Sequence, residues 1–273
     1  MTAYLLTDSA TMLRRSLRRM RRYPSLTFFI AVIPVVLLLL FVYVFGGTLG
    51  AGLGGPSAVA RPAGALVGRE AYIAYVIPGI LLMTVAGTGQ GTAISVAMDM
   101  TAGIIARFRT MAIARAAVLG GHVLGSVIQT ALAMVIVVVV ALLVGFRPTT
   151  APVAWLAAIG LLALTAVAVS WLSVAMGMAT GSVETASNTP LILTLLVFLS
   201  SAFVPTASMP APLAWFAEHQ PFTPIAESLR SLLFGTPIGD NGLVAVAWCL
   251  AISAGAFVWA RRLYERMPAR VAA

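Results

Sequence analysis

This 273-residue sequence lacks the lysine of a nucleotide-binding P-loop and has few acids that could carry a proton within a membrane. A nucleotide-binding P-loop needs a lysine that reaches the β- and γ-phosphates, but all 17 basic residues here are arginine. A proton- or sodium-coupled carrier usually places an acid within the membrane. The acids of this chain instead lie at or beyond the ends of apolar segments: Asp8, Glu70, Asp99, Glu184, Glu218, Glu227, Asp240 and Glu265. The pattern argues against either energy source within this polypeptide.

Residues suited to nucleophilic or metal chemistry are also few. His122 and His219 are the only histidines, Cys249 is the only cysteine, and no G-x-S-x-G motif is present. Nucleophilic catalysis needs a base beside the nucleophile, whereas the topology inferred below puts the two histidines at opposite faces of the membrane. The pattern disfavours an intramembrane enzyme, and we expect no metal and no cofactor bound by this chain.

The composition indicates a polytopic membrane protein. Hydrophobic residues make up 60% of the chain and charged residues 9%, against about 25% charged in an ordinary soluble domain. A spanning helix needs about 20 mostly apolar residues. The segments that fit are 26–45, 72–98, 118–144, 153–180, 190–204 and 243–260, of which the fifth is short and is followed by Pro205. We therefore expect an all-α fold with six transmembrane helices in a single transmembrane domain, 1–273.

The arginines are unevenly divided between the two sides of these spans. Six precede the first span, three fall in the loop 99–117 and four follow the last span, whereas the other side holds Arg61, Arg69, Arg147 and Arg230. The positive-inside rule then places both termini in the cytoplasm, in a multi-pass protein of the cell (inner) membrane. A net charge of +9 is also compatible with nucleic-acid binding. The position of the arginines beside apolar spans favours topology, and we expect no nucleic-acid partner.

Residues 1–24 have the pattern of an amphipathic helix. Their apolar residues at helical spacing form one stripe, and six arginines lie on another side: Arg14, Arg15, Arg18, Arg19, Arg21 and Arg22. Such a helix is expected to lie in the membrane interface, with its arginines towards anionic lipid. The alternative is a basic flank that only fixes the topology.

The loop 99–117 can form a short cytoplasmic helix. Ile104, Ile105, Phe108, Met111 and Ala112 can share one helical face, and Arg107 and Arg109 flank it. A basic amphipathic helix of this kind is suited to docking in the groove of a partner protein. A loop whose arginines only set the topology is an equally open interpretation.

The segment 205–242 is apolar but contains too many prolines for one continuous helix. These are Pro205, Pro210, Pro212, Pro221, Pro224 and Pro237. Broken helices are tolerated at membrane depth where protein buries them, so we expect re-entrant, outward-facing helices between the fifth and sixth spans. A plain extracellular loop, with Trp215 in the interface, is the alternative.

Several stretches together resemble the membrane subunit of type-2 ABC exporters, in the branch of the daunorubicin/doxorubicin-resistance permeases. They are Gly103–Arg115 with the following Ala116–Gly121, then Phe198–Pro205, Ser208–Pro210 and Trp215–Pro224. The six-span layout and the basic N-terminal helix agree with that family. The chain departs from it at Met100, Thr101, Ala106 and Ala112, where the family usually has arginines, an acid and a proline.

The resemblance implies how the protein is driven. Two permease subunits would pair with two copies of a separate ABC ATPase, which binds the ATP and magnesium. We expect the two permease subunits to be a homodimer, and a pair of different subunits is the alternative. The loop 99–117 is then the coupling helix that seats in the ATPase, through Gly103, Arg107, Phe108, Arg109, Met111 and Arg115. Because the acid is absent at Ala106, any salt bridge to the ATPase taken from the family is in doubt.

Polar and aromatic residues within the spans are candidates for a transport path. Gln90, Gln129, Phe198 and Phe203 are assigned to it. Hydrogen bonding between helices is the alternative for Gln90, Thr92 and Gln129, and the better supported one. Glycine pairs at Gly87/Gly91, Gly121/Gly125 and Gly177/Gly181 can seat neighbouring helices, although 24 glycines make such spacing frequent by chance.

We conclude from the sequence that this chain is the permease subunit of an ATP-driven exporter. Its expected cargo is a hydrophobic drug, lipid or polyketide-like compound, and the expected outcome is efflux and drug resistance. The alternative is a self-sufficient secondary carrier or channel for a hydrophobic solute. Uphill transport by the chain without an ATPase would favour that alternative.

Overall fold

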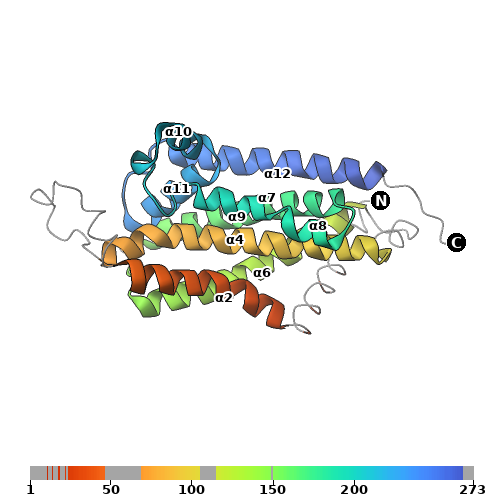
Figure 1. The fold of residues 1–273 in the computed structure, drawn as a ribbon, viewed down its shortest axis with the longest axis horizontal. Coiled ribbons are helices and arrows are strands. Elements are labelled where there is room, and N and C mark those ends of the chain that lie inside the picture. Colours follow the sequence, from red (N-terminus) through yellow and green to blue (C-terminus); the bar gives the residue numbers. More distant parts are fainter. Residues whose placement is uncertain are drawn as a thin grey trace, which may run out of the picture.

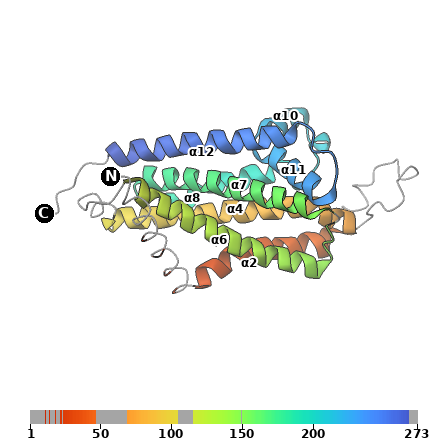
Figure 2. The same ribbon diagram turned by 180° about the vertical axis from the view of Figure 1, so that it is seen from behind.

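The computed structural model describes residues 24–46, 69–104, 115–148 and 150–266, together with Thr11, Arg14, Arg18 and Arg22. These residues form helices and turns, with no β-strand among them, which confirms the all-α expectation. The helices lie side by side in an elongated bundle (Figures 1 and 2). This arrangement suits a membrane, because a helix satisfies its own backbone hydrogen bonds where lipid offers no partner.

The first half of the described chain contains three passes along the bundle. α2 (Pro24–Leu40) continues as the π-helix η1 (Phe41–Phe45), and Pro34 lies inside α2. α4 (Arg69–Thr101) returns in the opposite direction, and α6 (Arg115–Val144) is the next described helix (Figure 1). The predicted segments 26–45, 72–98 and 118–144 fall within these helices.

The second half contains the long helices α7 and α12, the shorter helices α8 and α9 between them, and three short helices that follow α9. α7 is Pro152–Ala179, α8 is Val183–Asn188, α9 is Leu191–Phe198 and η3 is Thr206–Ser208. α10 (Ala211–His219) and α11 (Phe222–Phe234) gather at one end of the bundle, and α12 (Asn241–Arg266) runs back along its side (Figure 1). α11 ends at Gly235, whose φ of 72° is the left-handed conformation common after a helix.

Four of the described helices are long and apolar enough to cross a bilayer. They are Arg69–Thr101, Val118–Val144, Pro152–Ala179 and Asn241–Arg266, while the apolar stretches Ile30–Phe45 and Val183–Phe198 are shorter. Large apolar side chains are widely exposed on this bundle, including Leu143 at 81%, Leu243 at 78% and Val153 at 75%. A soluble protein avoids such extended apolar surface, whereas hydrocarbon tails cover it at no cost.

The segment predicted as the fifth span, 190–204, is only partly helical. α9 ends at Phe198, and the following residues turn back towards α4. Ser200 Oγ donates to the carbonyl oxygen of Val197 at 2.6 Å and accepts from the amide of Ala202 at 3.1 Å. These hydroxyl bonds replace helical ones, so the helix ends well before Pro205.

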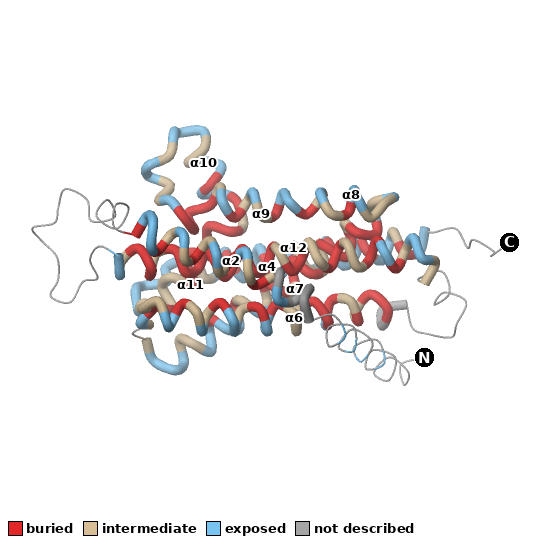
Figure 3. The backbone as a smooth tube through the Cα atoms, turned by 60° about the horizontal axis from the view of Figure 1, so that its bottom comes forward, coloured by how far each residue is buried: buried red, intermediate tan, exposed pale blue. Residues whose placement is uncertain are grey.

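α4 is the centre of the bundle. It packs against α2, α6, α7, α8, α9 and α11, and Figure 3 shows its backbone mostly buried. The main apolar core runs along its first half and includes Tyr72, Ile77, Ile80 and Leu82. A smaller cluster lies at the other end of the bundle, which the sequence predicts to face the cytoplasm; we call this end the inner end and the cluster the inner cluster. It is formed by Val96, Leu119, Val123, Val174, Ala175, Met178, Ala260 and Tyr264.

Close contact between α4 and α7 depends on two glycines. A Cβ atom at Gly177 would lie 2.5 Å from the carbonyl oxygen of Ala93, and one at Gly89 would lie 2.6 Å from Ser173 Oγ. Small residues allow helix backbones to approach in this way in membranes. In two of the glycine pairs named from the sequence, Gly87/Gly91 and Gly177/Gly181, one member makes no close approach, because a Cβ at Gly87 or Gly181 would meet nothing within 4 Å.

Substitution of Gly177 should therefore loosen the bundle. We expect Gly177→Ala to lower the free energy of unfolding by about 1–3 kcal/mol, because the obstacle is backbone and cannot rotate away. Thermal unfolding of the purified protein in detergent measures the effect.

Gly160→Ala on the same helix is the matched control, since nothing lies within 4 Å of its added Cβ. It should leave the melting temperature unchanged or slightly raised, because alanine favours a helix more than glycine does. Equal effects of the two substitutions would contradict the role assigned to Gly177.

Candidate functional site

The inner end of the bundle carries the ends of the predicted coupling loop. α4 closes with a turn at Ala102 and Gly103, and Gly103 has a φ of 68°. The amide of Gly103 donates to the carbonyl oxygen of Met100 at 3.1 Å. Arg107, Phe108, Arg109 and Met111 lie outside the described residues, and Arg115 is described only as the first residue of α6. Docking by these residues therefore stays a prediction.

Asp99 and His122 meet at this end of the bundle. His122 Nε2 lies 3.3 Å from Asp99 Oδ2, and the two side chains are 12% and 6% exposed. The sequence placed each residue at the inner end of its span but did not pair them. Their places on either side of the same connection were the signal, because successive antiparallel helices bring the residues near their joined ends side by side.

The connection between α7 and α9, which contains no arginine, is held by hydrogen bonds within it. Ser182 caps α8, since its Oγ accepts from the amide of Thr185 at 3.1 Å. Glu184 is exposed in the first turn of α8, and Ser187 Oγ donates to its carbonyl oxygen at 2.7 Å. The N-terminus of α8 is thus capped by Ser182.

A layer of hydroxyl groups separates the main core from the inner cluster. Thr92 of α4 and Ser170 of α7 both donate to Ser126 Oγ of α6, at 2.7 Å and 2.8 Å. All three residues are buried. Buried hydroxyls in lipid must find protein partners, so this layer ties three helices together at one level.

The residues predicted to line a transport path are divided between two levels. Phe203 stacks on Phe198 and on Phe41, with ring centroids 5.1 and 5.3 Å apart, and it is packed against Gly79 of α4. Gln90 lies eleven residues further along α4, about 16 Å away along the axis, and its Nε2 donates to the carbonyl oxygen of Ser187 at 2.7 Å. Gln90 thus joins α4 to α8, and Gln129 on α6 is half-buried. Contact of any of these residues with cargo stays a prediction.

Arg230 holds the outer helices onto α4. Its guanidinium lies 4.0 Å above the Tyr75 ring and donates to the carbonyl oxygens of Tyr75 and Ser201, at 3.2 and 3.1 Å. It also pairs with Glu227 at 2.6 Å. A planar guanidinium can serve these directions at once, so one side chain joins α11, α4 and the turn after α9.

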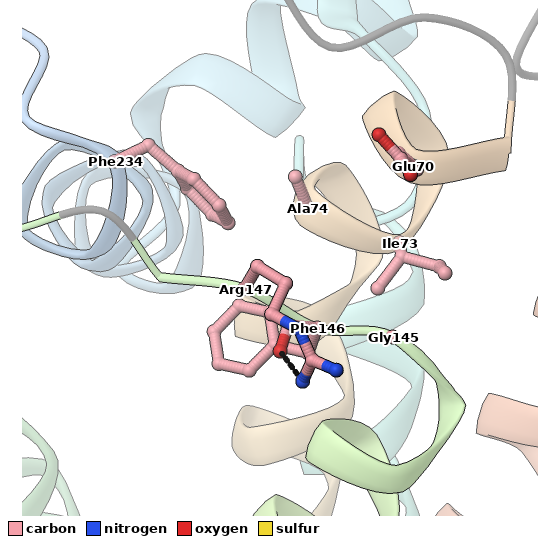
Figure 4. A pocket seen from close by; sticks show the side chains of 7 residues that line it. All are labelled: Glu70, Ile73, Ala74, Gly145, Phe146, Arg147 and Phe234. Atoms are coloured by element: carbon pink, nitrogen blue, oxygen red, sulfur yellow. Dashed lines mark hydrogen bonds between the residues drawn. The ribbon is translucent and has the colours of Figure 1, made fainter.

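A pocket at the same end opens between α4, α6 and α11 (Figure 4). It encloses about 290 Å³, including open solvent at its mouth, and is lined by Glu70, Ile73, Ala74, Gly145, Phe146, Arg147 and Phe234. Arg147 donates to the carbonyl oxygens of Leu142 and Phe146, at 3.1 and 3.4 Å. The arginine therefore caps the end of α6, and we assign no ligand to this pocket.

His219 and three of the N-terminal arginines lie exposed in the described part of the chain. The ring of His219 stacks on Trp215 with centroids 4.7 Å apart, and its Nδ1 lies 2.7 Å from the carbonyl oxygen of Trp215. Arg14, Arg18 and Arg22 are helical and exposed, while Arg15, Arg19 and Arg21 lie outside the described residues. The described residues contain no cluster of three or more potential metal ligands.

Comparison with known proteins decides the family. The family model described as "ABC-2 type transporter" matches residues 8–234. The chain belongs to the ABC-2 type transporter family. It is also 29% identical, over 247 residues, to the daunorubicin resistance ABC transporter permease protein DrrB1 of Streptomyces coeruleorubidus, a match that covers 90% of this chain and 80% of the relative.

Family membership gives the long apolar helices their setting. An ABC-2 permease is a multi-pass membrane protein, and its family implies a partner ATPase. The permease is not itself the catalytic subunit. The resemblance noted in the sequence is thereby confirmed, and the match includes both the inner loop and the segment that carries Arg230.

Removal of the Arg230 side chain should destabilise this ABC-2 permease. Arg230→Met removes the cation that faces Glu227 and the guanidinium that donates to the carbonyl oxygens of Tyr75 and Ser201, which should cost about 1–3 kcal/mol of folding free energy. Arg230→Lys should recover only part of this loss, because an ammonium group cannot serve the same directions. Thermal unfolding in lipid nanodiscs measures both.

Arg147→Met is the control at the same end of the molecule. Arg147 is exposed and its bonds are to its own helix end, so its loss should matter by less than about 1 kcal/mol. If Arg230→Lys matched the native protein, the multiple contacts of the guanidinium would not be what holds α11.

Proposed function

We propose that this chain is the membrane subunit of an ATP-driven exporter that moves a hydrophobic compound out of the cytoplasm. The observation that carries the proposal is the family match over residues 8–234, in a chain that has no lysine for a P-loop of its own. Energy then comes from a separate ABC ATPase, two copies of which bind ATP and magnesium. Two permease chains form the homodimer on which they act.

The proposed topology has six spans and cytoplasmic termini. α2 with η1, α4, α6, α7, α8 with α9, and α12 are the six passes, and the arginine-rich ends share one side. α10 and α11 then form the outward-facing re-entrant element. Its support is the packing of α11 against α4, α7 and α12, together with buried Phe222, Ile225 and Leu229. The exposed helical arginines Arg14, Arg18 and Arg22 suit an interfacial helix.

Charge placement supports drive from outside the chain. Among the described residues, Asp99 is buried near the inner end of α4, and Glu227 lies on α11 at the outer end. The levels between them carry hydroxyl groups such as Thr88, Ser126 and Ser170. Serine and threonine hydroxyl groups neither take up nor release a proton near neutral pH, so we infer that ATP-driven movement of the helices, and not ion binding, alternates access to the cargo.

The cargo class is proposed from the relative and from the apolar interior. The relative is named for daunorubicin resistance, and the aromatic stack of Phe41, Phe198 and Phe203 offers flat apolar surface of the kind that a hydrophobic ring system contacts. A drug, a lipid and a polyketide-like compound all fit that chemistry. Efflux of such a compound would give resistance to it.

Transport measurements test the function directly. Inside-out vesicles that contain this permease and an ABC ATPase encoded beside it should take up daunorubicin only when ATP is present. The variant Phe108→Ala with Arg109→Ala should insert normally but lose most ATPase co-purification and uptake, because the docking helix loses its apolar anchor and a charge.

Arg261→Ala is the matched control, since Arg261 is exposed on α12 and pairs only locally, with Glu265 at 2.9 Å. It should keep both co-purification and uptake. ATP-independent uphill uptake by the permease alone would overturn the proposal in favour of a self-sufficient carrier, and full co-purification of the double variant would remove the docking role from the loop.

Labelling of engineered cysteines tests the orientation. In a Cys249→Ser background, a membrane-impermeant maleimide should label Asp240→Cys on intact cells but should label Glu265→Cys only after the membrane is opened. Both positions are exposed and bracket α12, so each controls for the other. The reverse pattern would place the termini outside.

A further inference from the structure

The pairing of Asp99 with His122 joins the two helices that flank the loop between α4 and α6. Asp99 lies in the last turn of α4, and His122 lies two turns into α6, which begins at Arg115. The 3.3 Å separation and the low exposure of both side chains make this an inter-helix contact inside the protein.

Electrostatics require a cation near Asp99. The carboxyl end of a helix carries partial negative charge, so the dipole of α4 disfavours a carboxylate in its last turn. Burial adds a further cost unless the charge is paired. His122 faces that carboxylate, with its Nε2 3.3 Å from Asp99 Oδ2, so an imidazole N–H can donate to it, and loss of His122 would remove this contact from a buried carboxylate.

Apolar residues around Asp99 and His122 pack these ends of α4 and α6 together with α7 and α12. Val96 and Leu119, each three residues before a member of the pair, belong to the inner cluster, as does Val123 directly after His122. The same cluster includes Val174 and Ala175 of α7 and Ala260 and Tyr264 of α12. The hydroxyl layer at Ser126 then divides this unit from the main core.

We propose that Asp99 and His122 are positioning residues that make the inner ends of α4 and α6 move together when the intervening loop is displaced. Both ends of the loop lead into these two helices, so a push on it would otherwise separate them. The Asp99–His122 contact, here called the tie, instead passes the displacement on to the rest of the helix bundle. The inference rests on the proposed function, in which this loop seats in the ATPase.

Distance measurements report on the tie itself. In a Cys249→Ser background, spin labels at Thr101→Cys and Leu124→Cys sit at exposed positions on α4 and α6. The permease in nanodiscs should give one narrow distance distribution, unchanged when the ATPase and a non-hydrolysable ATP analogue are added. Asp99→Asn removes the carboxylate charge and His122→Gln removes the imidazole ring. Each variant should broaden the distance distribution.

Coupling measurements report on its role. The ratio of daunorubicin transported to ATP hydrolysed should fall about fivefold or more in Asp99→Asn and in His122→Gln, while ATPase co-purification persists. The exchanged pair Asp99→His with His122→Asp should recover part of the ratio, because it restores a charged contact. His219→Gln, at the exposed outer histidine, is the control and should match the native protein.

The possible failures are distinguishable. Native distances and coupling in both neutral variants would overturn the tie, and so would loss of ATPase co-purification in them, since the pair would then only shape the docking surface. If the native permease bound no ATPase at all, the proposed function would fail, whereas a narrow distribution that broadens in the variants would still establish the contact.

Discussion

The absence of water around the bundle is the constraint on which its structure depends. A buried polar group in hydrocarbon must find its partner within the protein, and α4, surrounded by other helices on most sides, has the least access to anything else. Its hydroxyls comply: Thr84 Oγ1 donates to the carbonyl oxygen of Ile80 at 2.8 Å, one turn back, and Thr92 reaches Ser126 on α6. Gly89 and Gly177 let α7 come close enough to complete the seal around this helix.

The same constraint separates the polar contacts into levels. Charged side chains hold the ends of α4, through Asp99 with His122 at one end and through Arg230 with Tyr75 at the other. Hydroxyl groups occupy the level between the two apolar clusters. An ABC-2 permease built in this way has firm ends and weaker bonds between them, which suits helices that must shift against each other without exposing a charge to lipid.

Hydropathy alone located the long helices, because lipid imposes the same apolar pattern on every side of a span. The segments 72–98, 153–180 and 243–260 lie within or at the ends of α4, α7 and α12. The same measure overestimated the helix in 190–204. Hydropathy does not record that Ser200 can take over the hydrogen bonds of Val197 and Ala202, so the turn after Phe198 is invisible to it.

Contacts between helices were the part that sequence reasoning reached least. The charge and periodicity of 99–117 marked the loop as a docking helix, but they did not reveal that Asp99 and His122 touch, since pairing depends on the rotation of each helix about its axis. Arg230 was counted only as an outer charge for the same reason. Glycine spacing was a poor guide as well: Gly89, which belongs to no i, i+4 glycine pair, meets α7, whereas Gly87 meets nothing. Nearly all residues of the bundle are apolar, so its few polar groups indicate how each helix is rotated about its axis. A polar group indicates this only once its partner on the neighbouring helix is known.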